Sequence, residues 1–162
     1  MTLVVAVDGP SGSGKTTFAA ELAAALDGDV VVLHMDDLYA GWDGLVDGVA
    51  VLASDVLEPV AAGERASYRP WDWESGVRGS AVVVPAVSVL MVEGVGSSAL
   101  PAGKFADYVV WLEAGSEVRY QRAIARDGET FAAQWDRWAE QERALFDADD
   151  TRARADLIVL TD

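Results

Sequence analysis

The sequence contains no cysteine, a single histidine and few basic residues. Without cysteine the chain has no disulfide framework, no thiolate metal site and no cysteine nucleophile. Its 12 Lys and Arg face 27 Asp and Glu, which gives a formal net charge of −15. Because a surface this negative repels phosphodiester backbones and anionic lipid, we expect neither a nucleic-acid partner nor a membrane-surface role.

Long hydrophobic runs are also missing. The longest apolar stretch, residues 81–92, is interrupted by Pro85 and Ser88 and is too short to cross a bilayer. The N-terminus enters an apolar strand directly, without a basic segment or a cleavage site, so we expect no signal peptide. A chain of 162 residues suits one compact domain. We therefore expect a single cytoplasmic domain over residues 1–162.

Short apolar runs alternate with longer segments of helical period, a pattern that predicts an α/β fold with a parallel sheet. The predicted strands, all expected to be buried on both faces, are 3–7, 30–33, 87–92, 108–112 and 157–160. The predicted helices are 15–26, 45–62, 116–126 and 130–146. We expect Pro59 to kink or end the second helix, Ser116 to cap the third and Gly128 to stop it. Residues 63–85 follow neither period and are interpreted as a hairpin or loop that leaves the core.

Residues 9–16 read Gly-Pro-Ser-Gly-Ser-Gly-Lys-Thr, the Walker A spacing of a phosphate-binding loop. They follow an apolar strand and open an alanine-rich helix, as such a loop requires. Glycines in this loop let backbone N–H groups point inward around phosphate oxygens, and the helix N-terminus adds a positive dipole end. Lys15 is expected to bridge the β- and γ-phosphates of ATP, and the Thr16 hydroxyl to ligate Mg²⁺. The predicted nucleotide contacts are Gly9, Ser11, Gly12, Ser13, Gly14, Lys15, Thr16 and Thr17.

Acidic residues follow three of the predicted strands, where ligands of open α/β sheets collect. Glu93 comes after four apolar residues, a Walker-B-like position for an acid that holds Mg²⁺ directly or through water. Asp36 is our candidate for the base that takes the proton of an acceptor hydroxyl. Asp8 and Asp37 can equally well be functional carboxylates or residues that cap the helix after each strand. His34 is interpreted as a packed or solvated side chain rather than a catalyst.

Arg119, Arg122 and Arg126 are spaced three and four residues apart and therefore share one face of the predicted helix. The run ends in Arg126-Asp127-Gly128, which is a natural hinge. Arginines on a mobile segment can neutralise charge on a transferring phosphoryl group while closure excludes water. We assign this role to Arg122 and Arg126, within a short lid of about residues 122–130. The alternative is a solvated basic face that pairs with nearby acids.

This pattern resembles the uridine kinase-like branch of P-loop kinases, near phosphoribulokinase and pantothenate kinase. Besides the loop itself, Asp36-Asp37-Leu38-Tyr39 is similar to the family's Asp-x-Phe-Tyr motif. Pro70-Trp71-Asp72-Trp73 is similar to its Tyr-Asp-Phe, with Arg78 at the expected distance. The match continues through Val92-Glu93-Gly94 and the lid position, and ends with Thr151–Val159.

The resemblance implies a three-layer P-loop NTPase sandwich with a five-stranded parallel sheet in the order 2-3-1-4-5. It also implies that Asp36 is the base and that Thr16, Asp36 and Glu93 surround Mg²⁺. The chain departs from the family where an acceptor would be chosen, because the stretch from Tyr39 to Trp71 is compressed. Gly76 stands where a uridine-selective enzyme has histidine. Uridine as the acceptor therefore stays an open question.

The sequence thus predicts an ATP- and Mg²⁺-dependent kinase that phosphorylates a hydroxyl of a small metabolite, nucleoside-like by resemblance. A kinase of a sugar or pantothenate-like acceptor is one alternative, and a nucleotide-binding regulatory protein without an acceptor is another. Aromatic side chains near the site can stack on a planar acceptor or can simply cover the small sheet. The residues expected to contact the acceptor are Tyr39, Trp42, Asp43, Trp71, Asp72, Trp73 and Arg78.

Overall fold

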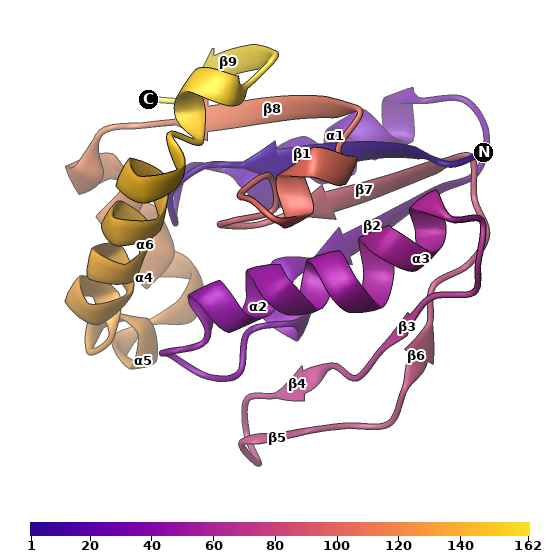
Figure 1. Ribbon diagram of the computed structural model, residues 1–162. Coiled ribbons are helices and arrows are strands. Elements are labelled where there is room, and N and C mark those ends of the chain that lie inside the picture. Colours follow the sequence, from indigo (N-terminus) through magenta and orange to yellow (C-terminus); the bar gives the residue numbers. More distant parts are fainter.

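A five-stranded parallel sheet forms the centre of the molecule in the computed structural model, which describes residues 1–162 (Figure 1). Its strands are β1 (Leu3–Asp8), β2 (Val30–His34), β7 (Val89–Glu93), β8 (Tyr108–Glu113) and β9 (Leu157–Leu160). They lie in the order β2-β7-β1-β8-β9, in which β7, β8 and β9 are the third, fourth and fifth strands of this sheet along the chain. The α/β fold with a five-stranded parallel sheet is therefore confirmed. Because β1 is central, the loop that follows it lies in the middle of the sheet edge.

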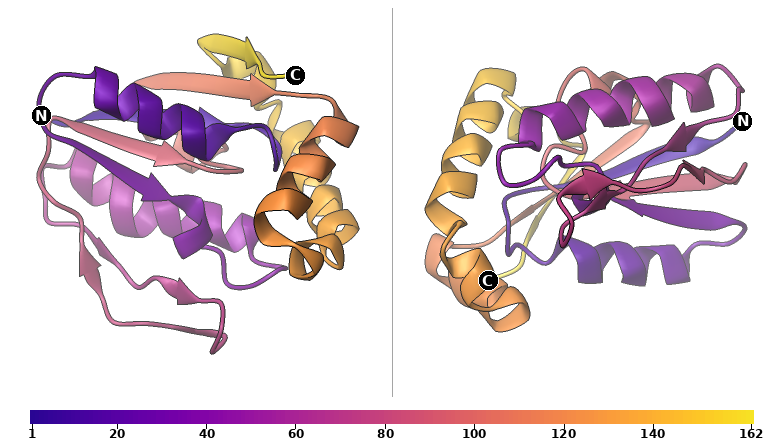
Figure 2. Two further views of the ribbon diagram at one scale, coloured as in Figure 1. Left: turned by 180° about the vertical axis from the view of Figure 1, so that it is seen from behind. Right: turned by 90° about the horizontal axis from the view of Figure 1, so that it is seen from below.

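Helices cover both faces of the sheet. The helix α1 (Lys15–Ala25) packs on one face, over a buried cluster of 7 residues. A continuous helical stretch packs on the other face over a cluster of 20 buried residues, and it comprises α2 (Leu45–Val51), η2 (Leu52–Leu57) and α3 (Glu58–Ala61). The right-hand view of Figure 2 separates these layers, with α1 and α2 on opposite sides of the strands.

The helical stretch over residues 45–61 differs in detail from the uniform helix that the sequence predicts. Its middle segment, η2, has the wider π-helical turn, and Pro59 follows directly in α3. Because a proline nitrogen cannot donate to the preceding turn, a change in hydrogen-bond pattern at this point accommodates it. The helix then ends at Ala61, two residues beyond the proline.

The C-terminal helices also depart from the prediction. Residues 116–127 form α4 (Ser116–Asp127), but Gly115 rather than Ser116 occupies the capping position, and Gly128 ends the helix with a φ of 70°. The predicted helix over 130–146 is two helices, α5 (Glu129–Ala132) and α6 (Trp135–Asp149). The break falls at Ala133-Gln134, which the apolar spacing alone does not reveal.

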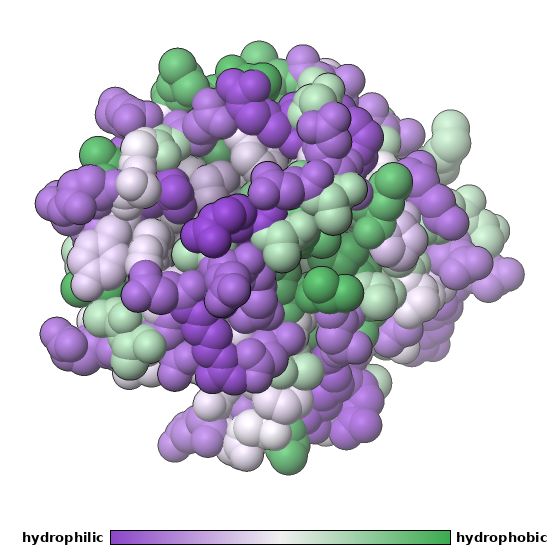
Figure 3. All heavy atoms as spheres, turned by 60° about the vertical axis from the view of Figure 1, so that its left-hand side comes forward, coloured by the Kyte–Doolittle hydropathy of each residue, from purple (hydrophilic) through white to green (hydrophobic).

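The prediction that every strand is buried on both faces holds only in part for the edge strand β2, where residues 30–32 are half-buried, and it is wrong for β9. Leu157, Ile158 and Leu160 are 44%, 40% and 71% exposed. This strand lies at the edge of the sheet and pairs only with β8, so its apolar composition does not imply burial. Figure 3 shows the neighbouring side of the molecule, where α4, α5 and α6 lie, and hydrophilic side chains cover most of it.

Residues 67–83 form a projecting arm of two short antiparallel ladders, below α2 and α3 in Figure 1. The ladders pair β3 (Ser67–Tyr68) with β6 (Val82–Val83), and β4 (Trp71–Asp72) with β5 (Val77–Arg78). Short 3-10 turns complete the fold: η1 (Met35–Asp37), η3 (Ala102–Phe105) and η4 (Arg152–Arg154).

None of the helices has both the length and the apolar character that spanning a bilayer requires.

Candidate active site

One cavity of about 670 Å³ lies at the carboxyl ends of the central strands. At one end, which we call the phosphate-loop end, it is lined by Ser11, Gly12, Gly14, Lys15, Thr16 and Thr17. At the other, the aromatic end, it is lined by Tyr39, Trp42, Trp73, Phe131 and Trp138. Asp36, Glu93, Arg122 and Arg126 also line it. The structure therefore brings together most of the residues that the sequence assigned to nucleotide, metal and catalysis.

The loop over residues 9–16 has the backbone that its glycines predict. Gly9, Gly12 and Gly14 have φ values of 137°, 79° and 92°, which side-chain-bearing residues rarely adopt. Space is an independent constraint, because a Cβ at Gly9 would lie 2.2 Å from the Leu112 carbonyl oxygen. A Cβ at Gly12 would lie equally close, 2.2 Å, to that of Arg119. The backbone conformation thus requires glycine at all three positions, and at Gly9 and Gly12 the packing requires it as well.

Side chains from distant elements hold this loop from its outer side. Three of them donate to carbonyl oxygens of residues 11–13: Arg119 to Ser11 at 3.3 Å, Arg122 to Gly12 at 3.4 Å and Thr161 to Ser13 at 2.7 Å. Arg122 also donates to the backbone carbonyl of Thr161 and, at 3.1 Å, to its hydroxyl. Arg122 lines the cavity, but its guanidinium group is hydrogen-bonded to backbone carbonyl oxygens. Gly9 and Ser13, which the sequence assigned to the nucleotide, do not line the cavity.

Lys15 is folded back onto its own loop. Its Nζ donates to the Pro10 carbonyl oxygen at 2.8 Å and to Ser13 Oγ at 3.4 Å, and the residue is only 7% exposed. Burial lowers the pKa of Lys15, and the negative charge of Glu142 is the strongest of the opposing influences. A bound phosphate would replace these loop contacts of the ammonium group.

Asp8 fastens the start of the loop to the segment after β7. Its carboxylate accepts hydrogen bonds from the N–H groups of Gly9 at 2.7 Å, Gly96 at 2.9 Å and Ser98 at 2.9 Å, and from Ser98 Oγ at 2.7 Å. Burial raises the pKa of Asp8, although these donors favour the charged form. Asp8 does not line the cavity, and its contacts are those of a structural anchor.

Glu93, at the end of β7, contacts the first turn of α1. Its Oε2 accepts a hydrogen bond from the Thr16 hydroxyl at 3.3 Å, and its Oε1 lies 2.5 Å from Nδ1 of His34. Glu93 is 4% exposed. His34 therefore positions this carboxylate, a contact that the sequence interpretation of a merely packed or solvated histidine missed. The signal available in the sequence was that His34 and Glu93 both end neighbouring parallel strands.

Asp36 faces the same cavity from η1. The residue keeps solvent-exposed surface. The pKa of its carboxyl group is nevertheless raised, mainly because the cavity walls partly desolvate it and secondly because Glu93 is negatively charged. The positive charges of Arg126 and Lys15 oppose this rise. These mutual effects place the four charged groups within electrostatic reach of one another. Asp37 does not line the cavity, and its pKa is raised mainly by burial.

The oxygen donors of Thr16, Glu93 and Asp36 fit a hard cation such as Mg²⁺, which binds to one or two protein carboxylates and to substrate phosphates. The Thr16–Glu93 contact and the repulsion between Asp36 and Glu93 favour a cation at this place. No three His, Asp or Glu side chains gather closely enough to hold a metal by themselves. A magnesium ion here would therefore depend on nucleotide phosphates for its remaining ligands.

Of the three arginines on this face of α4, Arg126 at the end of the helix is the one whose side chain makes no bond to the loop backbone. It lines the cavity and donates twice to Asp127, at 3.0 and 2.7 Å. The hydrogen bond to Asp127 raises the pKa of Arg126, so its guanidinium group stays protonated. Of the predicted arginines, Arg126 is thus placed to meet an anion in the cavity.

The aromatic end is built around Trp42. Its ring centroid lies 4.9 Å from that of Trp73, 5.4 Å from Phe131 and 6.2 Å from Trp138. Two polar atoms of this end are already paired: Tyr39 Oη donates to the Val95 carbonyl oxygen at 2.6 Å, and Trp73 Nε1 to that of Asp36 at 2.9 Å. The walls consequently offer mainly aromatic surface.

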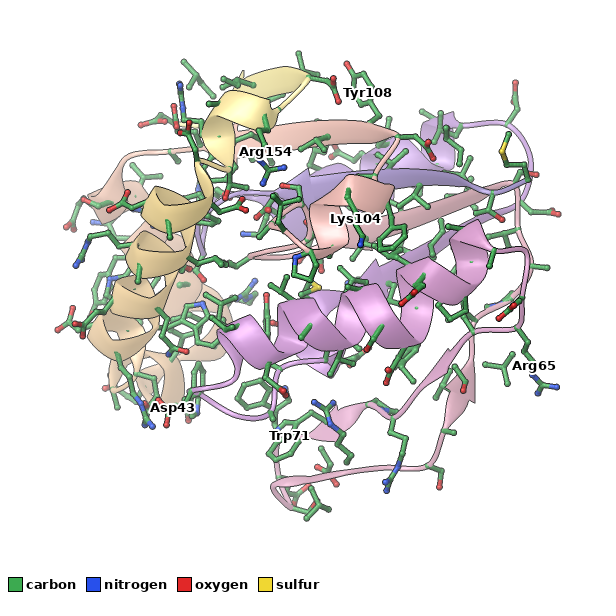
Figure 4. The ribbon with its side chains drawn as sticks, viewed as in Figure 1. Asp43, Arg65, Trp71, Lys104, Tyr108 and Arg154 are labelled. Carbon is green, nitrogen blue, oxygen red and sulfur yellow. The ribbon has the colours of Figure 1, made fainter.

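Four residues that the sequence assigned to an acceptor lie outside the cavity lining. Asp43 forms an exposed ion pair with Arg137, and Asp72 accepts the Glu74 N–H at 2.9 Å within the turn of the arm. Arg78 donates to the Leu38 carbonyl oxygen at 2.9 Å and lies over the Trp71 ring. Figure 4 shows Trp71 on the arm and Asp43 beside the foot of α6. The bond from Arg78 to Leu38 attaches the arm to the body, and the Asp43–Arg137 pair attaches α6 to the loop after η1.

Phe131 and Trp138 line the aromatic end and were not among the predicted site residues. Both come from the segment after the arginine helix, which the sequence identifies only as helical. Their part in the cavity depends on how α5 and α6 fold back over η1. A contact between segments almost a hundred residues apart has no local signal in the sequence.

Comparisons with known proteins show which folds this chain is similar to. No protein-family model matches the chain, and no curated protein matches it. Among solved structures, the chain is similar to one described as a possible uridine kinase from Bacillus stearothermophilus. The TM-score is 0.72 and the identity 24%, over 98% of this chain and 88% of that one.

Two further structures are similar over nearly the whole chain. One is described as a candidate fructose transport system kinase from Silicibacter sp. TM1040, with a TM-score of 0.57 and 21% identity over 97% of this chain and 89% of that one. The other is a shikimate kinase from Bacteroides thetaiotaomicron, with a TM-score of 0.56 and 16% identity over 96% and 85%. The chain therefore has a uridine kinase-like P-loop kinase fold. At these identities the likeness establishes the fold, and the reaction has to be argued from the site.

Proposed function

We propose that this protein is an ATP- and Mg²⁺-dependent kinase that transfers the γ-phosphate to a hydroxyl group of a small molecule. The observation that carries the proposal is the composition of one cavity. A Walker A lysine, two carboxylates and an arginine that makes no bond to the loop backbone line it beside the phosphate loop. The same cavity, about 670 Å³ in all, extends to an aromatic end away from the loop. A protein that only bound nucleotide would not need that second compartment.

Nucleotide binding uses the loop as a cradle. Its inward N–H groups and the α1 N-terminus hold the phosphate oxygens, and Lys15 leaves the Pro10 carbonyl oxygen to bind the β- and γ-phosphates. Thr16, Glu93 and Asp36 would hold Mg²⁺ between them and the phosphates. The ion, when bound, neutralises charge on the phosphoryl oxygens.

Transfer uses the groups between the two ends. Asp36 accepts the proton of the acceptor hydroxyl as a carboxylate, the form that Arg126, Lys15 and a bound Mg²⁺ favour. Arg126 stabilises the charge that develops on the transferring group, and residues 122–130 act as a short lid that excludes water. Arg122 contributes mainly by holding the loop and the segment around Thr161 in register.

The acceptor is a molecule with a flat or apolar body that stacks in the aromatic end and presents its hydroxyl toward Asp36. A nucleoside has this shape, and a similar structure is described as a possible uridine kinase. A non-nucleoside acceptor is the second candidate, because the Tyr39 hydroxyl and the Trp73 N–H are engaged with backbone and cannot read the edge of a base. Two similar structures are described as a candidate fructose transport system kinase and a shikimate kinase.

An acceptor screen tests the proposal. Purified protein with ATP and Mg²⁺ is assayed for ADP release in the presence of nucleosides, sugars, pantothenate-like alcohols and cyclic hydroxy acids. We expect one class to stimulate release and to gain a phosphate by mass spectrometry. Lys15→Ala should reduce the stimulated rate by about 100-fold or more, because it removes a preorganised charge from the phosphates. ATP binding without stimulation by any class would contradict the kinase assignment and favour a regulatory nucleotide-binding protein.

A further inference from the structure

Glu142 is a buried carboxylate that contacts the phosphate loop from a distant helix. It lies in the middle of α6 and is 4% exposed. Its Oε1 accepts the backbone N–H of Ser11 at 2.9 Å, across 131 residues of sequence. Burying a carboxylate is costly unless it meets donors, so this contact is a specific one.

The loop at Ser11 is held on both of its backbone groups. Arg119 of α4 donates to the Ser11 carbonyl oxygen at 3.3 Å, while Glu142 of α6 accepts from the Ser11 N–H. Two helices thus fix the orientation of one peptide segment in the loop. Since the neighbouring N–H groups must point at phosphate oxygens, this orientation determines how well the cradle is formed before ATP arrives.

Glu142 lies behind the loop rather than in the space for phosphate. Ser11 lines the cavity and Glu142 does not, although Glu142 is close enough to Lys15 for their charges to interact. A carboxylate that occupied the phosphate position would have to line the cavity. The geometry therefore favours support of the loop over mimicry of a phosphate.

The same helix also contacts the aromatic end. Trp138, one helical turn before Glu142, is a wall of the cavity, and its ring packs edge-on against Tyr39 at 4.8 Å. Gln141 donates to the Trp42 carbonyl oxygen at 2.5 Å. A single face of α6 therefore reaches both ends of the cavity, and Glu142 is its contact with the loop.

We propose that Glu142 is a positioning residue for the phosphate loop, which it preorganises for ATP by holding the Ser11 N–H from α6. The proposal rests on the proposed function, because it assigns the loop to ATP. It concerns nucleotide binding and leaves the identity of the acceptor open.

The test compares two substitutions with a matched control. Glu142→Gln keeps the size and an acceptor oxygen but loses the charge, whereas Glu142→Leu removes the acceptor altogether. Glu140→Gln makes the same charge change at an exposed position of the same helix. ATP binding is measured by calorimetry with Mg²⁺ and without acceptor, together with the melting temperature and the KM values for ATP and for the acceptor found in the screen.

We expect Glu142→Leu to weaken ATP binding by about 10- to 100-fold, the range for losing a hydrogen bond to a charged group. Glu142→Gln should recover part of this loss, because its neutral bond is weaker but present. KM for ATP should rise in both while KM for the acceptor changes by less than about twofold, a split that reduced folding alone does not give. Glu140→Gln should match the unchanged chain.

Two results would overturn the inference alone. ATP binding by both Glu142 variants at the strength of Glu140→Gln would remove the positioning role. Tighter binding by Glu142→Gln would mean that the carboxylate competes with phosphate. Should Glu142→Leu fail to fold, the near-isosteric Gln variant decides between these outcomes by itself. Failure of the unchanged chain to bind ATP would overturn the proposed function as well, whereas binding without transfer would overturn only the kinase assignment.

Discussion

The two ends of the cavity are built in different ways. The phosphate-loop end comes from one continuous segment, residues 9–17, whose backbone supplies the binding groups and whose glycines have positive φ. The aromatic end comes from four separate places, the loop after η1, the arm, α5 and α6, each of which contributes aromatic residues. One end is thus encoded locally, and the other exists only after the chain has folded.

This difference explains why the phosphate-loop end is rigidly held and chemically specific. Asp8, Arg119, Arg122, Thr161 and Glu142 all bond to backbone groups in or beside the loop. At the aromatic end the contacts are ring against ring, and such packing tolerates changes of side chain more readily. We infer that nucleotide use is fixed by the loop, whereas the acceptor is set by a surface that substitution can reshape.

Asp36 contacts both ends of the cavity, and its substitution is expected to change the rate of transfer more than any other substitution considered below. Its backbone carbonyl holds Trp73 of the aromatic end, while its carboxylate faces the charged groups beside the loop. Asp36→Asn should lower the rate of transfer by about 100- to 10,000-fold, the contribution of a general base. ATP affinity, measured by calorimetry without Mg²⁺, should stay within about threefold, because the loop is untouched. Acceptor-dependent ADP release at the normal rate in this variant would exclude Asp36 as the base.

The sequence predicts the parts of the fold and site that have a local signal. Each strand lies within two residues of its predicted bounds, because apolar runs between turns are local patterns. The loop and Glu93 are likewise found from strand ends and spacing. The break at Gln134 and the exposure of β9 are not predicted, because the apolar spacing continues through the first and the second depends on strand order. Pro59 predicts a change in the helix near η2 but not its π-helical form.

The acceptor-contacting residues illustrate the same limit within one short motif. Trp71 and Trp73 are two residues apart on the arm, and the sequence treats them alike. In the structure Trp73 lines the cavity and is 40% exposed, whereas Trp71 lies under Arg78 and outside the lining. Trp71 lies in β4, whereas Trp73 lies in the turn that follows it, so this turn and the attachment of the arm decide between the two side chains. Composition does not reveal either feature.

This pair supplies a matched test of the aromatic end. Trp73→Leu should raise KM for the acceptor by about three- to tenfold, since it removes one aromatic contact. Trp71→Leu makes the same change outside the cavity and should alter that KM by less than about twofold. KM for ATP should be unchanged in both, measured with the acceptor found in the screen. Equal effects of the two substitutions would contradict the assignment of the aromatic end to the acceptor.

The smallest expected effect is a displacement of the pH profile, and it concerns the electrostatic link between the two ends. Asp36 accepts a proton only as a carboxylate, and burial and Glu93 raise its pKa above the ordinary value. The kcat/KM for the acceptor should therefore fall as the pH decreases through the pKa that Asp36 has with Mg²⁺ bound, by at most about tenfold per pH unit, because the ion opposes the rise that burial and Glu93 cause.

Arg126 provides the means to move this acid limb, because its positive charge lowers the pKa of Asp36. Arg126→Gln removes that charge, so the pKa of Asp36 rises further and the limb should shift to higher pH, whatever the variant does to the absolute rate. Arg143→Gln, at an exposed position of α6, makes the same charge change away from the cavity and should leave the limb in place. The measurement is kcat/KM between about pH 4 and 8 for the unchanged chain and both variants, a range that brackets a raised aspartate pKa. If the limb stays where it is in Arg126→Gln, then Arg126 and the base are not coupled in the working enzyme, and the phosphate-loop and aromatic ends act on the reaction separately.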